Sequence, residues 1–222
     1  MRTLAVLALS LLTSGVFAQA VHPLTGRRIA PAMGPAGADW LERSEREKEE
    51  APDAALDLIG IQPGMIVADV GAGTGYITVK LARRVGATGR VYAEDIQPEM
   101  LDHVRDNASE AHLTNIETIL GSETDARLPA GKLDLILLID VYHEFSQPDK
   151  MMYALRRALK PDGRLVLLEY RKEDPSIPIR PDHKMSIADV KAEIEADGFR
   201  LETVNDALPR QHLFVFRKAQ TQ

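Results

Sequence analysis

The chain has 222 residues, with 27 basic and 33 acidic side chains and a formal net charge of −6. Its length predicts one domain with a sizeable core. An acidic chain with no long run of lysine and arginine is a poor candidate for binding nucleic-acid phosphates, so no nucleic-acid partner is expected. The absence of cysteine excludes disulfides, thiolate zinc sites and a cysteine nucleophile.

Residues 1–20 have the three parts of a secretory signal peptide. Arg2 supplies the positive start, an apolar stretch covers 4–17, and Ala18-Gln19-Ala20 forms an A-x-A cleavage site. The apolar stretch is shorter than the roughly 20 residues that a spanning helix needs. We therefore expect export to the periplasm or the medium, with no membrane span after cleavage. The location would be cytoplasmic if the signal is not used.

Residues 21–51 form the expected N-terminal arm, which begins with a stretch rich in proline and glycine. Asp39 then reads as an N-cap, and Glu42 completes a capping box. The helix expected over 40–50 carries oppositely charged pairs at i,i+4 spacing, which favours a solvated helix face. The alternative interpretation is a lid over a pocket, with Trp40 as its anchor.

Beyond residue 52, apolar strands alternate with amphipathic helices, which predicts a mostly parallel sheet covered by helices on both faces. Ligands of such sheets bind at the carboxyl ends of the strands. A Pro-Asp-Gly turn at 161–163 is expected to end the fourth of these helices. The expected strands are 65–70, 90–94, 116–120, 133–139, 164–170, 200–204 and 213–217, and the expected helices are 54–59, 76–84, 98–111, 149–160 and 186–197.

The strongest motif, Asp69-Val70-Gly71-Ala72-Gly73-Thr74-Gly75, follows the first of these strands. Gly71 and Gly73 allow a sharp turn and a close approach of the backbone to a ligand, and Gly75 lets the next helix start near the strand. A G-x-G pattern is weak alone, but a strand before it and a helix after it make it a candidate nucleotide loop.

The next strand ends at Glu94-Asp95, where a carboxylate can accept hydrogen bonds from both ribose hydroxyls. A dinucleotide site would require a further glycine at the position of Tyr76. That departure favours a nucleoside ligand without a pyrophosphate over a nicotinamide dinucleotide.

These motifs resemble those of class I S-adenosylmethionine-dependent methyltransferases. Asp69–Gly75 resembles the first motif of that family, Val91–Leu101 the second, Gly121–Leu128 the loop after the third strand, and 159–163 the L-K-P-G-G turn, with Asp162 in place of the first glycine. The resemblance implies a single Rossmann-like domain over 52–217, doubly wound, with a seven-stranded sheet whose last strand is antiparallel.

The resemblance also implies S-adenosylmethionine as the cofactor. Asp95 best matches the ribose-binding acid, with Glu94 beside it, and Asp125 is the candidate for the adenine amino group, with Glu123 as the alternative. The implied cofactor residues are Asp69, Gly71, Ala72, Gly73, Thr74, Gly75, Glu94, Asp95 and Asp125.

The acceptor side of the expected site contains four polar clusters at the same sheet edge: Asp140–Phe145, Glu169-Tyr170, His183 and Gln211-His212. Methyl transfer needs an acceptor held in line and, for some acceptors, a base. His143 is the candidate base by residue type, and Glu144 would orient it or bind substrate. His143, Glu144, His183 and His212 are also metal-ligand types, but the sequence shows no ligand spacing, so no metal is assigned.

The function expected is methyl transfer (EC 2.1.1.-) to an unidentified small molecule. A non-catalytic, exported protein that binds an adenosyl ligand is the alternative, and turnover separates the two. A nicotinamide oxidoreductase is a third, less favoured reading because of Tyr76.

Overall fold

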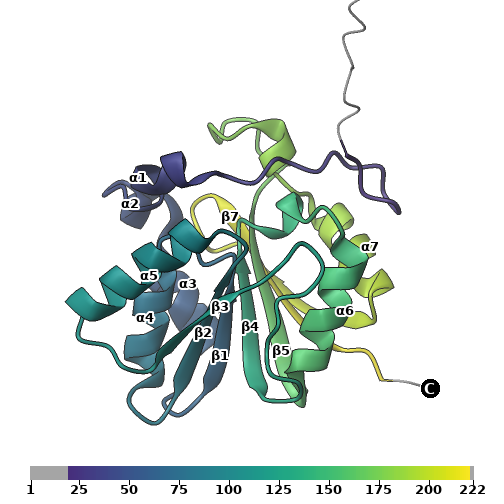
Figure 1. Ribbon diagram of the computed structural model, residues 1–222. Coiled ribbons are helices and arrows are strands. Elements are labelled where there is room, and N and C mark those ends of the chain that lie inside the picture. The colour runs from purple at the N-terminus through teal and green to yellow at the C-terminus, as the bar shows by residue number, and fades with distance from the viewer. Residues whose placement is uncertain (1–19, 221–222) are drawn as a thin grey trace, which may run out of the picture.

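The computed structural model describes residues 20–220, so the expected signal peptide lies, apart from Ala20, outside the described residues. Strands and helices alternate along the chain, as the sequence predicts (Figure 1). The strands are β1 Ile66–Val70, β2 Arg90–Asp95, β3 Ile116–Leu120, β4 Leu133–Ile139, β5 Leu159–Tyr170, β6 Phe199–Asn205 and β7 Gln211–Lys218. The helices are α1 Ala38–Leu41, α2 Arg46–Glu50, α3 Pro52–Ile59, α4 Tyr76–Val85, α5 Pro98–Glu110, α6 Pro148–Ala158 and α7 Ile187–Ala196, with short 3₁₀ helices at Pro35–Gly37, Tyr142–Glu144 and Pro181–His183.

The seven strands form one sheet in the order β3-β2-β1-β4-β5-β7-β6. β1 to β5 are mutually parallel, and β7 runs antiparallel to both β5 and β6. The expected Rossmann-like sheet with an antiparallel last strand is confirmed. The strand order changes side between β1 and β4, because β2 and β3 follow on one side of β1, and β4 and β5 on the other, and ligands of such sheets bind at this switch point.

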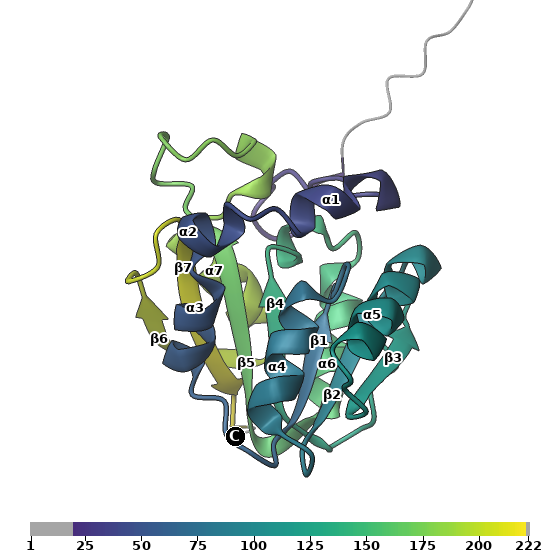
Figure 2. The same cartoon turned by 90° about the vertical axis from the view of Figure 1, so that its left-hand side faces the viewer.

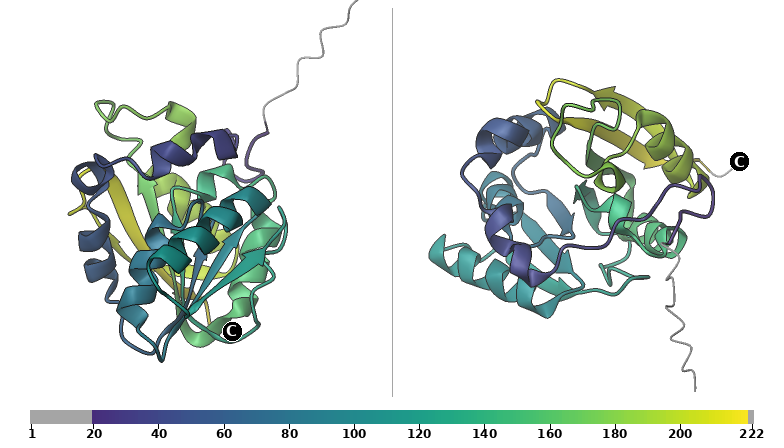
Figure 3. Two further views of the ribbon diagram at one scale, coloured as in Figure 1. Left: turned by 60° about the vertical axis from the view of Figure 1, so that its left-hand side comes forward. Right: turned by 90° about the horizontal axis from the view of Figure 1, so that it is seen from above.

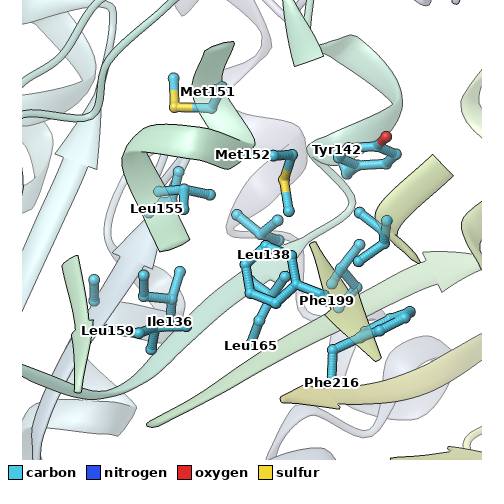
Figure 4. Packing of buried hydrophobic residues seen from close by; sticks show 14 of the residues in the cluster. Ile136, Leu138, Tyr142, Met151, Met152, Leu155, Leu159, Leu165, Phe199 and Phe216 are labelled. Atoms are coloured by element: carbon cyan, nitrogen blue, oxygen red, sulfur yellow. The ribbon is translucent and has the colours of Figure 1, made fainter. Parts of the chain in front are cut away.

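Helices α3, α4 and α5 cover one face of the sheet, and α6 and α7 cover the other (Figures 1 and 2). The middle strands are therefore buried on both faces, which explains why β4 is a continuous apolar run. On the α6 side, Met152 and Leu155 pack on Leu138 and Leu165 of the sheet, with Phe216 of β7 beside them (Figure 4). This core fixes the edge where β1, β2 and β4 end.

The expected helix over 40–50 is wrong, because the segment forms two short helices, α1 and α2, separated by 42–45. Asp39 does not cap it, since α1 begins after Gly37 without any side-chain cap. Nor is the face solvated: Arg46 and Glu50 are buried, and their side chains pair at 2.7 Å. The arm packs on the sheet edge, so burial rather than helix propensity sets its shape.

Two further boundaries differ from those expected. α6 begins at Pro148, the usual place for proline at a helix start, and ends at Ala158. The turn expected at 161–163 instead lies within β5, which begins at Leu159. An irregularity in the β4–β5 register, between Leu133 and Leu135, accommodates these extra residues.

Two segments extend over the carboxyl edge of the sheet. The N-terminal arm crosses it, and the segment between β5 and α7 stands next to it (Figures 1 and 3). Ser186 caps α7 by accepting the backbone N–H of Asp189. In the part of the chain that the structure describes, no helix has both the length and the apolar character to cross a membrane.

Candidate functional site

A cavity of about 1030 Å³ lies at the carboxyl edge of the sheet. Its floor is formed by residues at or just after the ends of β1, β2 and β4, among them Gly71, Asp95 and Asp140. The arm and the β5–α7 segment contribute the rest of the wall, including Trp40 and Ile179. The lid interpretation of the arm, with Trp40 at the pocket, therefore describes the structure better than a solvated helix.

The glycine loop meets the cavity at two positions. Gly71 and Gly73 both line it, and both have left-handed backbone conformations with φ of +70° and +55°. A Cβ on Gly71 would come within 2.3 Å of the Val141 side chain, and one on Gly73 within 2.7 Å of Leu41. Only glycine fits both the backbone and the space, so the loop can present bare main chain to a ligand.

The carboxylate of Asp95, at the end of β2, is held against this loop. It accepts the backbone N–H groups of Gly73 at 3.0 Å and Gln97 at 2.9 Å. Burial raises the pKa of Asp95, while these backbone N–H groups oppose the shift. Asp95 thus lies where the sequence places the ribose acid, on the cavity wall.

Glu94 also lines the cavity but is more deeply enclosed. Burial, followed by the charge of Asp95, raises its pKa to about 8. Its Oε1 atom has no hydrogen-bond partner among the described residues. A buried polar atom without a partner at a cavity wall is a candidate for contact with a ligand.

The other motif residues support the loop from outside the lining. Asp69 accepts the hydroxyl of Thr78 at 2.6 Å, and burial raises its pKa to about 6. Ala72 donates its backbone N–H to the carbonyl of Glu94, and Thr74 is buried. Gly75, which precedes α4, packs on Val104 of α5.

The loop after β3 places its two candidate acids differently. Glu123 lines the cavity and accepts a hydrogen bond from Ser146 at 2.9 Å. Asp125 is exposed and outside the lining, and its carboxylate accepts the backbone N–H of Arg127. The geometry therefore favours the alternative, Glu123, as the acid that faces a ligand.

The acceptor candidates gather around His143, in the 3₁₀ helix that follows β4. His143 is buried, and its Nδ1 donates to Oε2 of Glu169 at 2.6 Å. On the other side of the ring, Nε2 lies 3.1 Å from Nδ1 of His183 and 3.9 Å from Oε1 of Glu144. His143, Glu144 and His183 all line the cavity.

The ionisation of this group follows from its burial and its two carboxylates. Burial alone would lower the pKa of His143, but the charge and hydrogen bond of Glu169 outweigh it and raise that pKa. Burial raises the pKa of Glu144 to about 7, with His143 opposing and Glu169 adding to the shift. Burial and the neighbouring His143 lower the pKa of His183.

The remaining histidine of the expected set lies elsewhere. His212 is outside the cavity lining, and its two ring nitrogens contact Asp206 at 2.5 Å and Glu173 at 3.0 Å. Its neighbour Gln211 donates to Oδ2 of Asp140 at 2.6 Å, just behind the cavity floor. His212 is therefore separate from the group around His143.

Sequence reasoning missed several residues that build the site. The sequence places Glu169 and Tyr170 at the carboxyl edge of the sheet but gives them no role there, and it predicts that Arg46 lies on a solvated helix face. Glu169 holds His143, while Arg46 and Tyr170 line the cavity, and Tyr170 donates its hydroxyl to Glu50 at 2.7 Å. The position of Glu169 and Tyr170 at the carboxyl end of β5 was the sequence signal that could have pointed to them. Nothing in the sequence indicated the burial of Arg46.

A second missed contact fixes the arm. Arg27 pairs with the buried Glu193 of α7 at 2.9 Å, and its guanidinium also donates to the backbone carbonyl of His143. His22 lies 3.5 Å from the same carboxylate. The arm is thereby tied both to α7 and to the segment that carries His143.

Comparison with known proteins agrees with this geometry. The methyltransferase domain family matches residues 61–208. The ubiquinone/menaquinone biosynthesis C-methyltransferase UbiE of Hydrogenovibrio crunogenus is 34% identical over 119 residues, which is 53% of this chain and 47% of that protein. UbiE of Vibrio vulnificus strain YJ016 is 30% identical over 151 residues, or 65% of this chain and 58% of that protein. The chain thus spans about half the length of these curated relatives.

Among solved structures, a SAM-dependent methyltransferase from Aquifex aeolicus is similar over most of its length. It matches with a TM-score of 0.79 and 28% identity, covering 83% of this chain and 98% of that one. The fold, the glycine loop and the acid at the end of β2 occur together with a family match over more than half of the chain. The chain belongs to the class I S-adenosylmethionine-dependent methyltransferase family.

Proposed function

We propose that the protein transfers a methyl group from S-adenosylmethionine to a small-molecule acceptor. The observation that carries this proposal is one cavity of about 1030 Å³ that contains the glycine loop and Asp95 as well as His143 and Glu144. Ligand pockets usually measure about 300–1,000 Å³, so the volume of this cavity lies at the upper end of that range.

The residues present fit an adenosyl cofactor. Gly71 and Gly73 both line the cavity, and a Cβ on either would collide with Val141 or Leu41, so the loop meets a nucleoside with its main chain alone. The Asp95 carboxylate has about four lone-pair sites, and the backbone N–H groups of Gly73, Gln97 and Ile96 do not take all of them, so a ribose hydroxyl can still be accepted. The unpartnered Oε1 of Glu94 lies at the same wall.

S-adenosylmethionine, when bound, supplies a methyl group on a positively charged sulfur. The chain's own task is to hold an acceptor in line with that methyl and to exclude water. His143, fixed by Glu169, and Glu144 are the groups that we assign to the acceptor. They bind its polar group and take up the proton that an O–H or N–H acceptor releases.

The cavity also suggests the shape of the acceptor. On the acceptor side, polar groups lie at the end of β4 and at His183, whereas the arm and the β5–α7 segment contribute apolar wall at Ile29, Met33 and Ile179. This combination suits a molecule with an apolar body and a polar group at one end. The two UbiE relatives are named as C-methyltransferases of ubiquinone and menaquinone biosynthesis, which is consistent with an acceptor of this kind.

The first test is calorimetric titration with S-adenosylmethionine, S-adenosylhomocysteine and NAD in parallel. We expect micromolar binding of the two adenosyl ligands and none of NAD. Absence of adenosyl binding by the folded protein would overturn the proposal. Binding without methyl transfer to any of a panel of hydroxylated aromatic compounds would favour the non-catalytic adenosyl-binding alternative.

We also propose that residues 1–20 direct export and are removed. The three-part pattern of this segment supports the proposal. Cell fractionation followed by N-terminal sequencing tests it, with Val21 expected as the first residue of an exported protein. Recovery of chains that begin at Met1 from the cytoplasmic fraction would contradict it.

A further inference from the structure

Three ligand-type atoms from two separate segments form a compact triangle on the cavity wall. Nε2 of His143 lies 3.1 Å from Nδ1 of His183, and Oε1 of Glu144 lies 3.9 Å from the first and 3.7 Å from the second. A triangle with these sides has a point about 2.1 Å from all three corners, which matches the bond lengths of zinc to imidazole nitrogen and carboxylate oxygen.

A buried carboxylate stands behind one of these ligands. Glu169 is fully buried on β5 and accepts the Nδ1–H of His143 at 2.6 Å. This bond directs the lone pair of neutral His143 to Nε2, toward the triangle. Histidines that bind metals almost always donate their other N–H in this way, because the bond fixes the tautomer and the ring orientation.

The charge around the triangle also favours a cation. Two carboxylates, Glu144 and Glu169, lie within contact distance of His143, while the guanidinium groups of Arg27 and Arg180 are already paired with Glu193 and Asp182.

We propose that His143, Glu144 and His183 bind a divalent transition-metal ion of the zinc class on the acceptor side of the cavity. Two imidazoles and one carboxylate are a donor set that suits zinc and its neighbours in the first transition row, and does not suit magnesium or calcium. All three side chains line the cavity, so the remaining coordination positions face the space for the acceptor.

The competing interpretation is a plain hydrogen bond between two neutral imidazoles. In that arrangement His183 donates its Nδ1–H to Nε2 of His143, and Glu144 only stands nearby. In the metal site both nitrogens use their lone pairs for the ion, so the base role assigned to His143 above applies only to the metal-free protein. The two arrangements differ in whether the protein takes up a metal, which can be measured without any acceptor.

The test uses untagged protein freed of metal by a chelator, titrated with ZnCl₂ in a calorimeter and with CoCl₂ in a visible spectrophotometer. We expect one ion to bind per chain. With cobalt, we expect the visible absorption bands of a four- or five-coordinate Co²⁺ ion. His183→Ala should weaken binding by at least about 100-fold and abolish the cobalt spectrum. Glu169→Gln should weaken it by about 10–100-fold, as loss of a partner behind a ligand does.

The matched control is His103→Ala, which removes an exposed histidine of α5 outside the cavity. It should bind zinc as the unaltered protein does. No saturable zinc or cobalt binding, or equal binding by His183→Ala, would overturn the metal site. S-adenosylhomocysteine binding by His183→Ala, expected to be unchanged, reports the fold and the cofactor pocket. If the unaltered protein and the His103→Ala control bind zinc but none of the proteins binds S-adenosylhomocysteine, the result contradicts the proposed function and leaves the metal site standing.

Discussion

The carboxylate of Asp95 lies 3.0 Å from the backbone nitrogen of Gly73, so the end of β2 and the loop after β1 are joined by a hydrogen bond. The same carboxylate accepts the N–H of Gln97 at the start of the next helix. Asp95 therefore holds the glycine loop in shape while it also lines the cavity. The cofactor side of the site is built before any ligand arrives.

Replacing Asp95 by alanine should weaken S-adenosylhomocysteine binding by about 10–100-fold or more. The change removes charge-assisted hydrogen bonds worth about 1.5–3 kcal/mol, and each 1.4 kcal/mol is about a factor of ten. Calorimetric titration of the folded variant measures the effect. Asp106→Ala, an exposed acid of α5, is the control. An unchanged dissociation constant for Asp95→Ala would remove it from the binding site.

The loop after β3 allows a direct comparison of two acids. Glu123→Ala should weaken adenosyl binding by several-fold, because Glu123 lines the cavity, whereas Asp125→Ala should leave it within about two-fold. Titration of both variants with S-adenosylhomocysteine measures the difference. The reverse order would mean that the loop rearranges on binding and that Asp125 meets the adenine.

Asp69 should make stability depend on pH. Burial raises its pKa from 3.8 to about 6, so the folded state binds this proton more tightly than the unfolded state does. Above about pH 6 the folded protein carries a buried charge, and this cost fades as the pH falls toward 4. Asp69→Asn, which keeps an oxygen for Thr78, should raise the free energy of unfolding by up to about 3 kcal/mol at neutral pH.

Urea unfolding of both proteins near about pH 7.5 and about pH 4.5 measures this difference. The gain in the asparagine variant should be largest at the higher pH and should shrink at the lower one. An equal difference at both values would show that the Asp69 charge does not matter to folding.

Arg27→Ala should destabilise the protein by about 3–5 kcal/mol, because it leaves Glu193 buried without its partner. The double change Arg27→Met with Glu193→Leu should cost much less than the sum of the two single changes. Urea unfolding of the unaltered protein, Arg27→Met, Glu193→Leu and the double variant gives the coupling, and Arg27→Ala is measured beside them. A cost below about 1 kcal/mol for Arg27→Ala would mean that His22 or water replaces the lost contact.

The strands and the glycine loop were predictable because their signals are local. β3 and β4 have the expected bounds, and the loop from Asp69 to Gly75 stands between a strand and a helix as its pattern requires. The topology then brought His143 and His183 to one edge, and the structure places them in contact. Periodicity and glycine spacing determine these features without reference to distant residues.

The arm was not predictable by the same means. The charges of Arg46 and Glu50 have the spacing of a solvated helix, but both are buried under a segment whose position depends on the whole sheet. Likewise, the pairing of Arg27 with Glu193 joins residues 166 apart in the chain. Long-range burial of charges leaves no local pattern, so only the folded structure reveals it.

The arm across the carboxyl edge is fastened at both ends, by Arg27 to Glu193 on one side and by Glu50 to the hydroxyl of Tyr170 on the other. The part of the cavity wall that the arm contributes, including Met33 and Trp40, is therefore held in place by buried bonds at both of its ends. A substitution of Arg27 or Glu50 that breaks one of these bonds acts outside the cavity, yet it would change the shape of the space that a ligand meets inside.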